Sequence, residues 1–324
     1  MSKNFTLNQR RDFGDSLGDG ATFLKMNFKP LLSVFLTYVV PLMILPIVLL
    51  VMTGSMSSIM DIYSFDAMSN PGDSPFQGFA LVAIMLGFFF FYGLAYLTLN
   101  LAMYGSFLAY ETNGNVPVTA DEIKEKMREN LGNYIVSVLV YFGLILLLYI
   151  AMIAVVWLAA FIGVGLVFIL FLISMPLFVW IVNCMTNFSY IRMRENLTVG
   201  EAITRSFNLT KKNWWSMFGV LFISSIATSI ASYIFSIPFY IATFVGASSM
   251  SDTDGSSMTG FALLMALGFL IYMLGSLFLQ KYIAACTVLK YYDMVEQKDG
   301  SSVSAQIDML GESNDSYFEN EGEY

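Results

Sequence analysis

The chain has 324 residues, of which 57% are hydrophobic and 12% are charged, and its formal net charge is −8. Soluble domains average about 45–50% apolar and about 25% charged residues. The composition therefore excludes a soluble globular protein, a disordered chain and a nucleic-acid-binding protein, and it is typical of an integral membrane protein.

The first 30 residues are polar and mixed, without the apolar core of a signal peptide. We expect the chain to insert through its first membrane helix without cleavage. Histidine is absent and there are two cysteines, Cys184 and Cys286, each within an apolar stretch. We therefore expect neither histidine-based catalysis nor a disulfide scaffold, and no metal or cofactor.

Six apolar runs are long enough to cross a membrane, which takes about 20 helical residues. They are Leu31–Met52, Gly78–Leu101, Tyr134–Phe161, Leu166–Phe188, Trp214–Val245 and Phe261–Leu289. The second run is expected to continue as helix to Tyr110. Leu131–Ile191 carries no charge and would form a helix of about 90 Å, so it must fold back. Gly163-Val164-Gly165 is the expected corner.

The basic residues indicate the orientation of these spans. All 16 Lys and Arg residues lie before the first span, in the loops after the second and fourth spans, or at the end of the sixth span and in the tail. By the positive-inside rule this side is cytoplasmic, so we expect both termini in the cytoplasm. Residues 296–324 form an acidic tail that is expected to be largely disordered, with one short helix at Ser301–Leu310.

An internal three-fold repeat is predicted from three similar segments. Each begins with a capping-box pattern, at Ser16–Asp19, Thr119–Glu122 and Thr198–Glu201. Each continues as an amphipathic stretch that ends in asparagine and an aromatic residue before an odd-numbered span. These residues are Asn27, Phe28, Asn133, Tyr134, Asn213, Trp214 and Trp215. We interpret each asparagine as the cap of a membrane helix and each aromatic residue as an interfacial anchor.

The predicted fold is therefore an all-α integral membrane protein with six transmembrane helices. They form three repeated units, about 12–112, 113–195 and 196–295, each an amphipathic interfacial helix followed by a transmembrane hairpin. The amphipathic helices either lie in the headgroup plane or pack as elbows against the helix ends, and the sequence is compatible with both arrangements.

Uncharged polar residues are the candidate contacts within the membrane. No charged residue lies in the middle of a span, which argues against an ion-driven transporter. Lys281 is expected to extend toward the inner interface rather than into the bundle. Asn100, Asn183 and Gln280 lie at similar depths on the returning helices and are expected to face inward. The fifth span carries a stripe of hydroxyls at Ser224, Thr228, Ser232 and Ser236. Both sets fit either helix packing or a polar cavity.

The segment T-V-G-E-A-I-T-R-S-F at 198–207, followed by K-K-N-W-W at 211–215 and a span, resembles a known family. This family is the membrane domain associated with bacterial glycerophosphodiester phosphodiesterases, with its stand-alone multi-pass relatives. The resemblance covers residues 196–245, with a weaker similarity at 16–40. It implies a helical fold in the bacterial inner membrane. It does not imply hydrolase activity, because the soluble catalytic domain is missing from this sequence.

Two functions remain as hypotheses. The sequence has no nucleotide-binding loop, nucleophile elbow or zinc-protease motif, so we expect no enzymatic activity. The first hypothesis is a scaffold or accessory subunit that binds other membrane proteins. The alternative is a carrier or channel for lipids or small neutral solutes. An inward polar cavity would favour the alternative, and a lipid-facing groove of small residues filled by a partner helix would favour the scaffold. Membrane lipids and other membrane proteins are the expected partners, and nucleic acid is not.

Overall fold

The computed structural model describes residues 5–52, 75–160, 163–249 and 255–300, and every regular element within these ranges is helical. Six of the helical segments are long and apolar enough to cross a membrane, as the sequence predicts. These segments are Phe28–Pro46, Leu86–Thr112, Ala120–Trp157, Phe168–Glu195, Trp214–Phe244 and Leu264–Asp299.

The helices follow one another with short connections. In chain order they are α1 (Phe13–Met26), α2 (Phe28–Val34), the π-helical turn η1 (Phe35–Val39), α3 (Val40–Met52), α6 (Pro75–Thr112), α7 (Ala120–Ala160), α8 (Val164–Met185), α9 (Phe188–Glu195), α10 (Val199–Thr210), α11 (Trp214–Ser249), α12 (Gly255–Leu279) and α13 (Lys281–Asp299).

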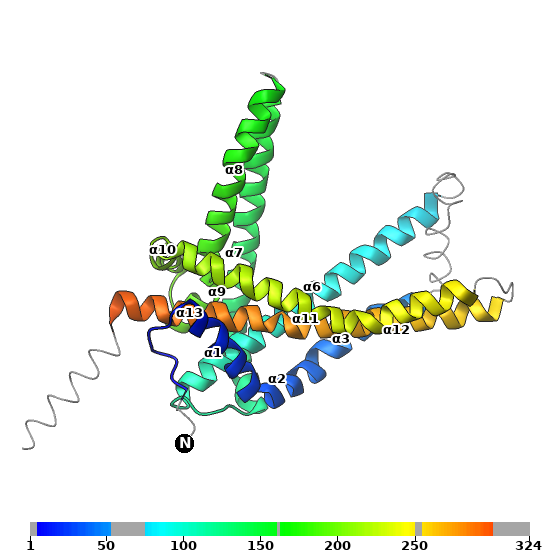
Figure 1. The fold of residues 1–324 in the computed structure, drawn as a ribbon, viewed down its shortest axis with the longest axis horizontal. Helices are drawn as coiled ribbons and strands as arrows, with labels where there is room; N and C mark the ends of the chain where they lie inside the picture. The colour runs from blue at the N-terminus through cyan, green and yellow to red at the C-terminus, as the bar shows by residue number, and fades with distance from the viewer. Residues whose placement is uncertain (1–4, 53–74, 161–162, 250–254, 301–324) are drawn as a thin grey trace, which may run out of the picture.

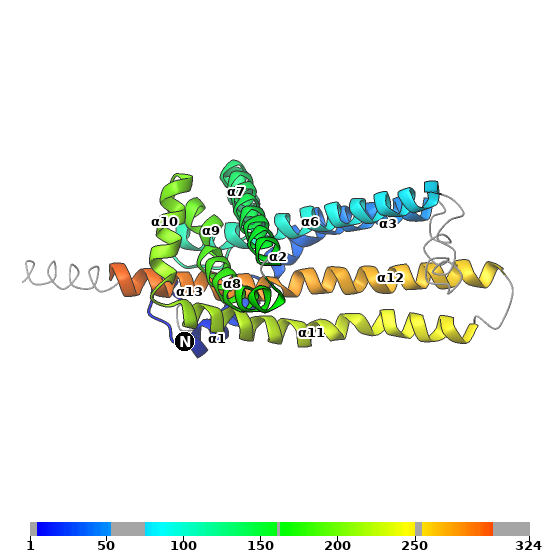
Figure 2. The same ribbon diagram turned by 90° about the horizontal axis from the view of Figure 1, so that it is seen from above.

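Three hairpins, α3–α6, α7–α8 and α11–α12, extend from one region of the molecule (Figure 1). We call this region the hub; it consists of α1, α9, α10, α13 and the adjoining ends of α6, α7 and α11. The α3–α6 and α11–α12 hairpins extend to the same side of the hub (Figures 1 and 2). The α7–α8 hairpin diverges from both, so its far end has no neighbouring hairpin in these views.

Aromatic side chains fill the core of the hub. The rings of Phe23 and Phe107 stack with their centroids 3.8 Å apart, and Tyr110 and Tyr190 are fully buried beside them. Gly20 brings α1 directly onto α13, because a Cβ at this position would lie 2.5 Å from the sulfur of Cys286. The hub is therefore packed as tightly as the core of a soluble domain.

Two of the hairpins also pack against each other near the hub. Val39, Met43, Leu99 and Leu277 form a buried apolar cluster that joins α3, α6 and α12. Within the α11–α12 hairpin the two helices approach closely at Gly275, where a Cβ would overlap the ring of Phe235. Small residues at such crossings allow the van der Waals contact that holds membrane helices together.

Two of the three predicted capping boxes are confirmed. The backbone N–H of Thr119 donates to Glu122, and Thr198 pairs with Glu201 in the same way. The box expected at Ser16–Asp19 is wrong, because α1 begins earlier. Its N-cap is Asp12, whose side chain accepts a hydrogen bond from the backbone N–H of Asp15.

The interpretation of the asparagines as helix caps is also corrected. Asn133 lies inside α7, which runs without interruption from Ala120 to Ala160, so no separate amphipathic helix precedes the third span. Asn27 lies between α1 and α2, but its side chain makes no capping hydrogen bond and instead accepts from the backbone N–H of Val118. An uninterrupted helix satisfies its own backbone groups, so Asn133 has no free N–H to cap.

The corner between the third and fourth spans lies where the sequence predicts it. α7 ends at Ala160 and α8 begins at Val164, with Gly163 before it at a φ of 152°, a conformation that favours glycine. The sixth predicted span is divided at Gln280 into α12 and α13, and α13 continues to Asp299. The short helix predicted at Ser301–Leu310 lies outside the described residues.

Candidate functional site

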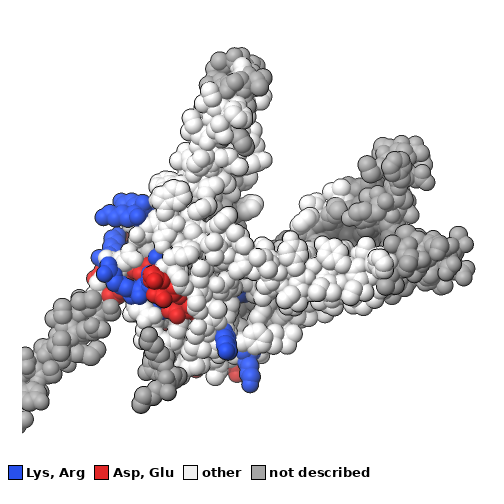
Figure 3. All heavy atoms as spheres, in the orientation of Figure 1, with Lys and Arg blue, Asp and Glu red and all other residues white. Residues whose placement is uncertain are grey.

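Charged side chains gather at the hub, whereas the visible surfaces of the three hairpins are almost free of charge (Figure 3). Three polar features lie at or near this region. They are a network of arginine, tyrosine and glutamate residues, a set of buried amides with one buried lysine, and a cavity lined by hydroxyl groups.

The first feature, the hub network, consists of Glu111, Tyr190, Arg194, Glu195, Tyr291 and Tyr292. Arg194 Nε lies 2.9 Å from Glu111 Oε2, and its Nη2 lies 2.6 Å from Oε1. The guanidinium carbon lies 4.6 Å from the ring centroid of Tyr292, in cation–π geometry. This arrangement is the bidentate pairing that the planar guanidinium of arginine favours.

The tyrosine hydroxyls extend the hub network. Tyr292 donates to Glu111 at 2.8 Å, and Tyr291 accepts from Arg194 at 2.9 Å while it donates to Glu195 at 2.6 Å. Glu111 ends the helix of the first hairpin, Arg194 lies on α9 after the second, and the tyrosines lie on α13 after the third. The network therefore fixes the returning helices of all three hairpins to one another.

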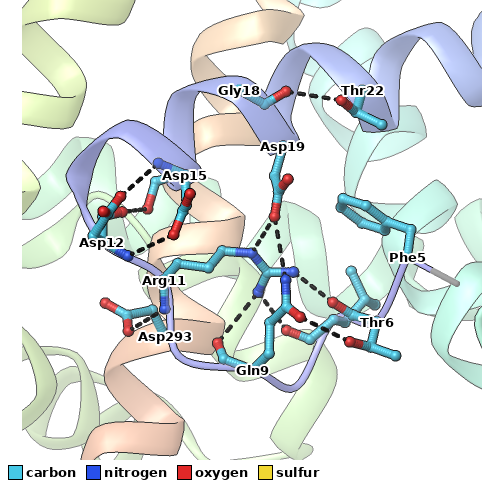
Figure 4. Close-up of polar contacts among 12 residues, drawn as sticks. Phe5, Thr6, Gln9, Arg11, Asp12, Asp15, Gly18, Asp19, Thr22 and Asp293 are labelled. Carbon is cyan, nitrogen blue, oxygen red and sulfur yellow. Dashed lines mark hydrogen bonds and ion pairs between the residues drawn. The ribbon is translucent and has the colours of Figure 1, made fainter. Parts of the chain in front are cut away.

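A second set of contacts attaches the N-terminal segment to α13 (Figure 4). Arg11 is buried, its Nε donates to Asp19 at 2.9 Å, and its backbone N–H donates to Asp293 at 2.9 Å. Lys290 also contacts Asp293, at 2.6 Å. Burial lowers the pKa of Arg11, although the carboxylate of Asp19 acts in the opposite direction. The contacts are those of a structural anchor.

Lys281 is buried, contrary to the expectation that it extends to the interface. It is 1% exposed, its Nζ donates to Asn100 Oδ1 at 2.7 Å, and it lies 4.6 Å from the ring centroid of Tyr96. The sequence could not indicate this, because the contact joins helices 181 positions apart. A buried ammonium needs such partners, since desolvation without them is costly.

The other two predicted amides lie in different surroundings. Asn183 is buried and donates to the backbone carbonyl of Trp214 at 2.9 Å, but its Oδ1 has no hydrogen-bond partner. Gln280 is partly exposed and interacts with the hydroxyl of Tyr92. The structure thus brings Asn100 to Lys281 but does not join the three amides into one site. Asn187, which the sequence analysis missed, also has a buried, unpartnered Oδ1.

The interfacial residues lie at the hub ends of the hairpins. Asn213 precedes α11 and donates to Gln297 at 3.1 Å, and the rings of Trp214 and Trp215 stack at the start of α11 with centroids 4.1 Å apart. Tyr134 is buried against α6, and Phe28 is exposed.

The third feature is a cavity of about 590 Å³ between α11 and α12, which we call the hydroxyl cavity. Its hydroxyl groups belong to Ser225, Thr228, Ser229, Ser232, Ser236 and Ser276. Rings of Tyr92, Phe239 and Phe269 complete the lining, and Gln280 lies at its hub end. Three of the four residues of the predicted stripe contribute to this lining. Ser224 does not; it is buried elsewhere and donates to the carbonyl of Val220 at 2.6 Å.

Thr228 is the unusual residue of the hydroxyl cavity. It is 6% exposed, and its Oγ1 has no hydrogen-bond partner. A buried hydroxyl without a partner costs about 1–3 kcal/mol, so polar groups in protein interiors rarely remain in this state. The hydroxyl is therefore available to a ligand that enters the cavity.

The sequence analysis missed the hub network, although one signal for it was present. Each returning helix ends in tyrosine residues near an acid, as in Tyr110-Glu111 and Tyr292-Asp293. Within the described ranges no group of three cysteine or carboxylate side chains is placed to hold a metal ion. No family model, no curated protein and no solved structure matches the chain. The fold and contacts define an α-helical protein with six candidate membrane spans.

Proposed function

We propose that the chain is a non-catalytic protein of the bacterial inner membrane that serves as a scaffold or accessory subunit for other membrane proteins. Its six spans leave both termini in the cytoplasm, with the hub at the cytoplasmic face. The observation that carries this proposal is the divergence of the α7–α8 hairpin from the other two (Figure 1).

The outer face of α7 is the surface that we assign to a partner helix. It consists of Val136, Leu139, Gly143, Leu146, Ile150 and Ile153, all of which are exposed. Their spacing alternates between three and four residues, which suits side-by-side packing with another helix. A Cβ on Gly143 would meet nothing within 4 Å, so the glycine has no packing role inside the chain. Glycines on such faces allow a partner helix to approach closely.

The hub network supports the same proposal. It holds the three hairpins at their cytoplasmic ends through Arg194, Glu111 and the tyrosines of α13. A scaffold needs such a fixed base, because a flexible one would lose rotational freedom when each partner binds.

Substitution at Gly143 tests the proposal. Photo-crosslinking residues at Leu139 and Leu146 of the full chain in cell membranes are expected to capture one defined membrane protein, and Gly143→Leu is expected to abolish this adduct by blocking close approach. Gly87→Leu on α6 is the control, because a Cβ at Gly87 also meets nothing within 4 Å. Adducts with lipid alone, or a protein adduct that persists in Gly143→Leu, would contradict the proposal.

The repeat and the family remain part of this proposal. Capping boxes at Thr119 and Thr198 and three hairpins that each return to the hub support a three-unit organisation. Membership of the membrane family associated with glycerophosphodiester phosphodiesterases rests on the segment at 198–215. The alternative function, a carrier or channel for lipids or small neutral solutes, is favoured by one observation, the hydroxyl cavity.

A further inference from the structure

The hydroxyl cavity has the features of a binding site rather than of a packing defect. Its volume of about 590 Å³ lies within the range of about 300–1,000 Å³ that is usual for small-molecule pockets. Polar groups gather on one side of it, on α11, and aromatic rings from α6, α11 and α12 lie around them. Stripes of serine often serve only close helix packing, but here the helices leave a space beside the stripe.

The serine hydroxyls present hydrogen-bond acceptors to this space. Ser225 donates to the carbonyl of Leu221 at 2.6 Å, Ser232 to that of Thr228 at 2.8 Å, and Ser276 to that of Met273 at 3.0 Å. Each hydroxyl has one proton and two lone pairs, so these serines have used their protons and keep lone pairs. A matching ligand must therefore carry several hydrogen-bond donors.

Thr228 supplies the independent evidence for a ligand. Its Oγ1 is buried, lines the cavity and has no partner within the described part of the chain. Unlike the serines, Thr228 keeps its proton, so it can both donate to a ligand and accept from it. A hydroxyl group on the ligand satisfies both roles.

The charge of the lining restricts the ligand further. The lining contains no Asp, Glu, Lys or Arg. An ionised group would lose its hydration there without meeting a counter-charge, which is unfavourable. We propose that the hydroxyl cavity binds an uncharged polyhydroxyl group, either the sugar headgroup of a glycolipid or a free sugar. The hydroxyls of the sugar ring contact α11, and its apolar faces lie against the aromatic rings.

The rim of the cavity indicates how such a group enters. Ser229, Tyr233 and Tyr240 line the cavity and are exposed on the outer side of α11. The cavity is therefore reached from beside the helix as well as from its hub end. This site does not depend on the scaffold proposal, whose surface is on α7.

Photolabelling of the full chain in phosphatidylcholine nanodiscs tests the inference. The probe is a glucosyl diacylglycerol with a photoreactive acyl chain, and adducts are mapped to peptides by mass spectrometry. A phosphatidic acid with the same acyl chain is the charged comparison. Equilibrium dialysis with radiolabelled glucose measures binding of the free sugar. Adducts on α11 and α12 that excess glucose does not remove identify the lipid headgroup as the ligand, and glucose binding in dialysis identifies the free sugar.

Two substitutions on α11 make the test specific. Thr228→Val replaces the unpartnered hydroxyl with a methyl group of similar size, so the protein should fold normally and lose about five- to tenfold in binding. Ser224→Ala is the matched control, because Ser224 is buried on the same helix outside the cavity. Ser232→Leu fills the cavity and should abolish binding. Neither glycolipid nor glucose binding, equal labelling by phosphatidic acid, or unchanged binding in Thr228→Val and Ser232→Leu would overturn the inference.

Discussion

Arg194 is the residue of the hub network whose replacement should cost the most stability. It makes two hydrogen bonds to the carboxylate of Glu111 and one to Tyr291, and it lies against the ring of Tyr292. In Arg194→Ala all of these contacts are lost, and Glu111 keeps only the hydrogen bond from Tyr292. The three hairpins then lose the charged link between their returning helices.

The size of the effect follows from the burial of the pair. Removal of one partner from a fully buried ion pair costs about 3–5 kcal/mol. The side chains of Arg194 and Glu111 are 17% and 29% exposed, so water screens part of the interaction. We therefore expect a loss of about 2–3 kcal/mol for Arg194→Ala. Arg194→Lys keeps the charge but loses the planar fork, and we expect about 1–2 kcal/mol.

Thermal unfolding in mild detergent, followed by circular dichroism, measures this loss. A change of about 2–3 kcal/mol should lower Tm by about 5 °C in a chain of this size. Lys124→Ala is the control, because the Lys124–Asp121 pair is largely exposed and should contribute about 0–0.5 kcal/mol. If Arg194→Ala unfolded at the same temperature as Lys124→Ala, the hub network would not hold the hairpins together and the reasoning would be refuted.

Three further predictions follow from individual contacts and from the charge distribution. Asn100→Leu should lower Tm because it leaves the Lys281 ammonium buried without its acceptor, and the added change Lys281→Met should restore Tm; an unchanged Tm in Asn100→Leu would contradict this. Gly275→Ala should cost about 1–3 kcal/mol through overlap with Phe235, whereas Gly87→Ala, which has open space, should be neutral in the same unfolding assay. Single cysteines should react with a membrane-impermeant reagent in intact cells at Ser57 and Asp254 but not at Ser304, and labelling at Ser304 would refute the topology. The two native cysteines are buried and give little background.

The properties that the sequence determined by itself are local ones. Six apolar runs, the corner at Gly163 and the capping boxes at Thr119 and Thr198 depend on residues within a helix turn or within one span. Hydropathy over about 20 residues is sufficient to define a span, because the bilayer supplies the apolar environment that a soluble protein must build from distant segments. The start of α1 was misplaced because Asp12 and Ser16 are both acceptable caps, and sequence alone does not rank them.

Only the tertiary structure decided which polar groups meet. The partner of Lys281 is Asn100 on another hairpin, and Arg194 pairs with Glu111 across 83 positions. The serines that line the hydroxyl cavity differ from the predicted stripe in that Ser225 and Ser229 take part and Ser224 does not. The four-residue spacing places these side chains on a helix, but the rotation of that helix against α12 selects the face that borders the cavity. This rotation results from the close contact at Gly275 and from the burial of many apolar side chains together, and no short segment of the sequence contains that information.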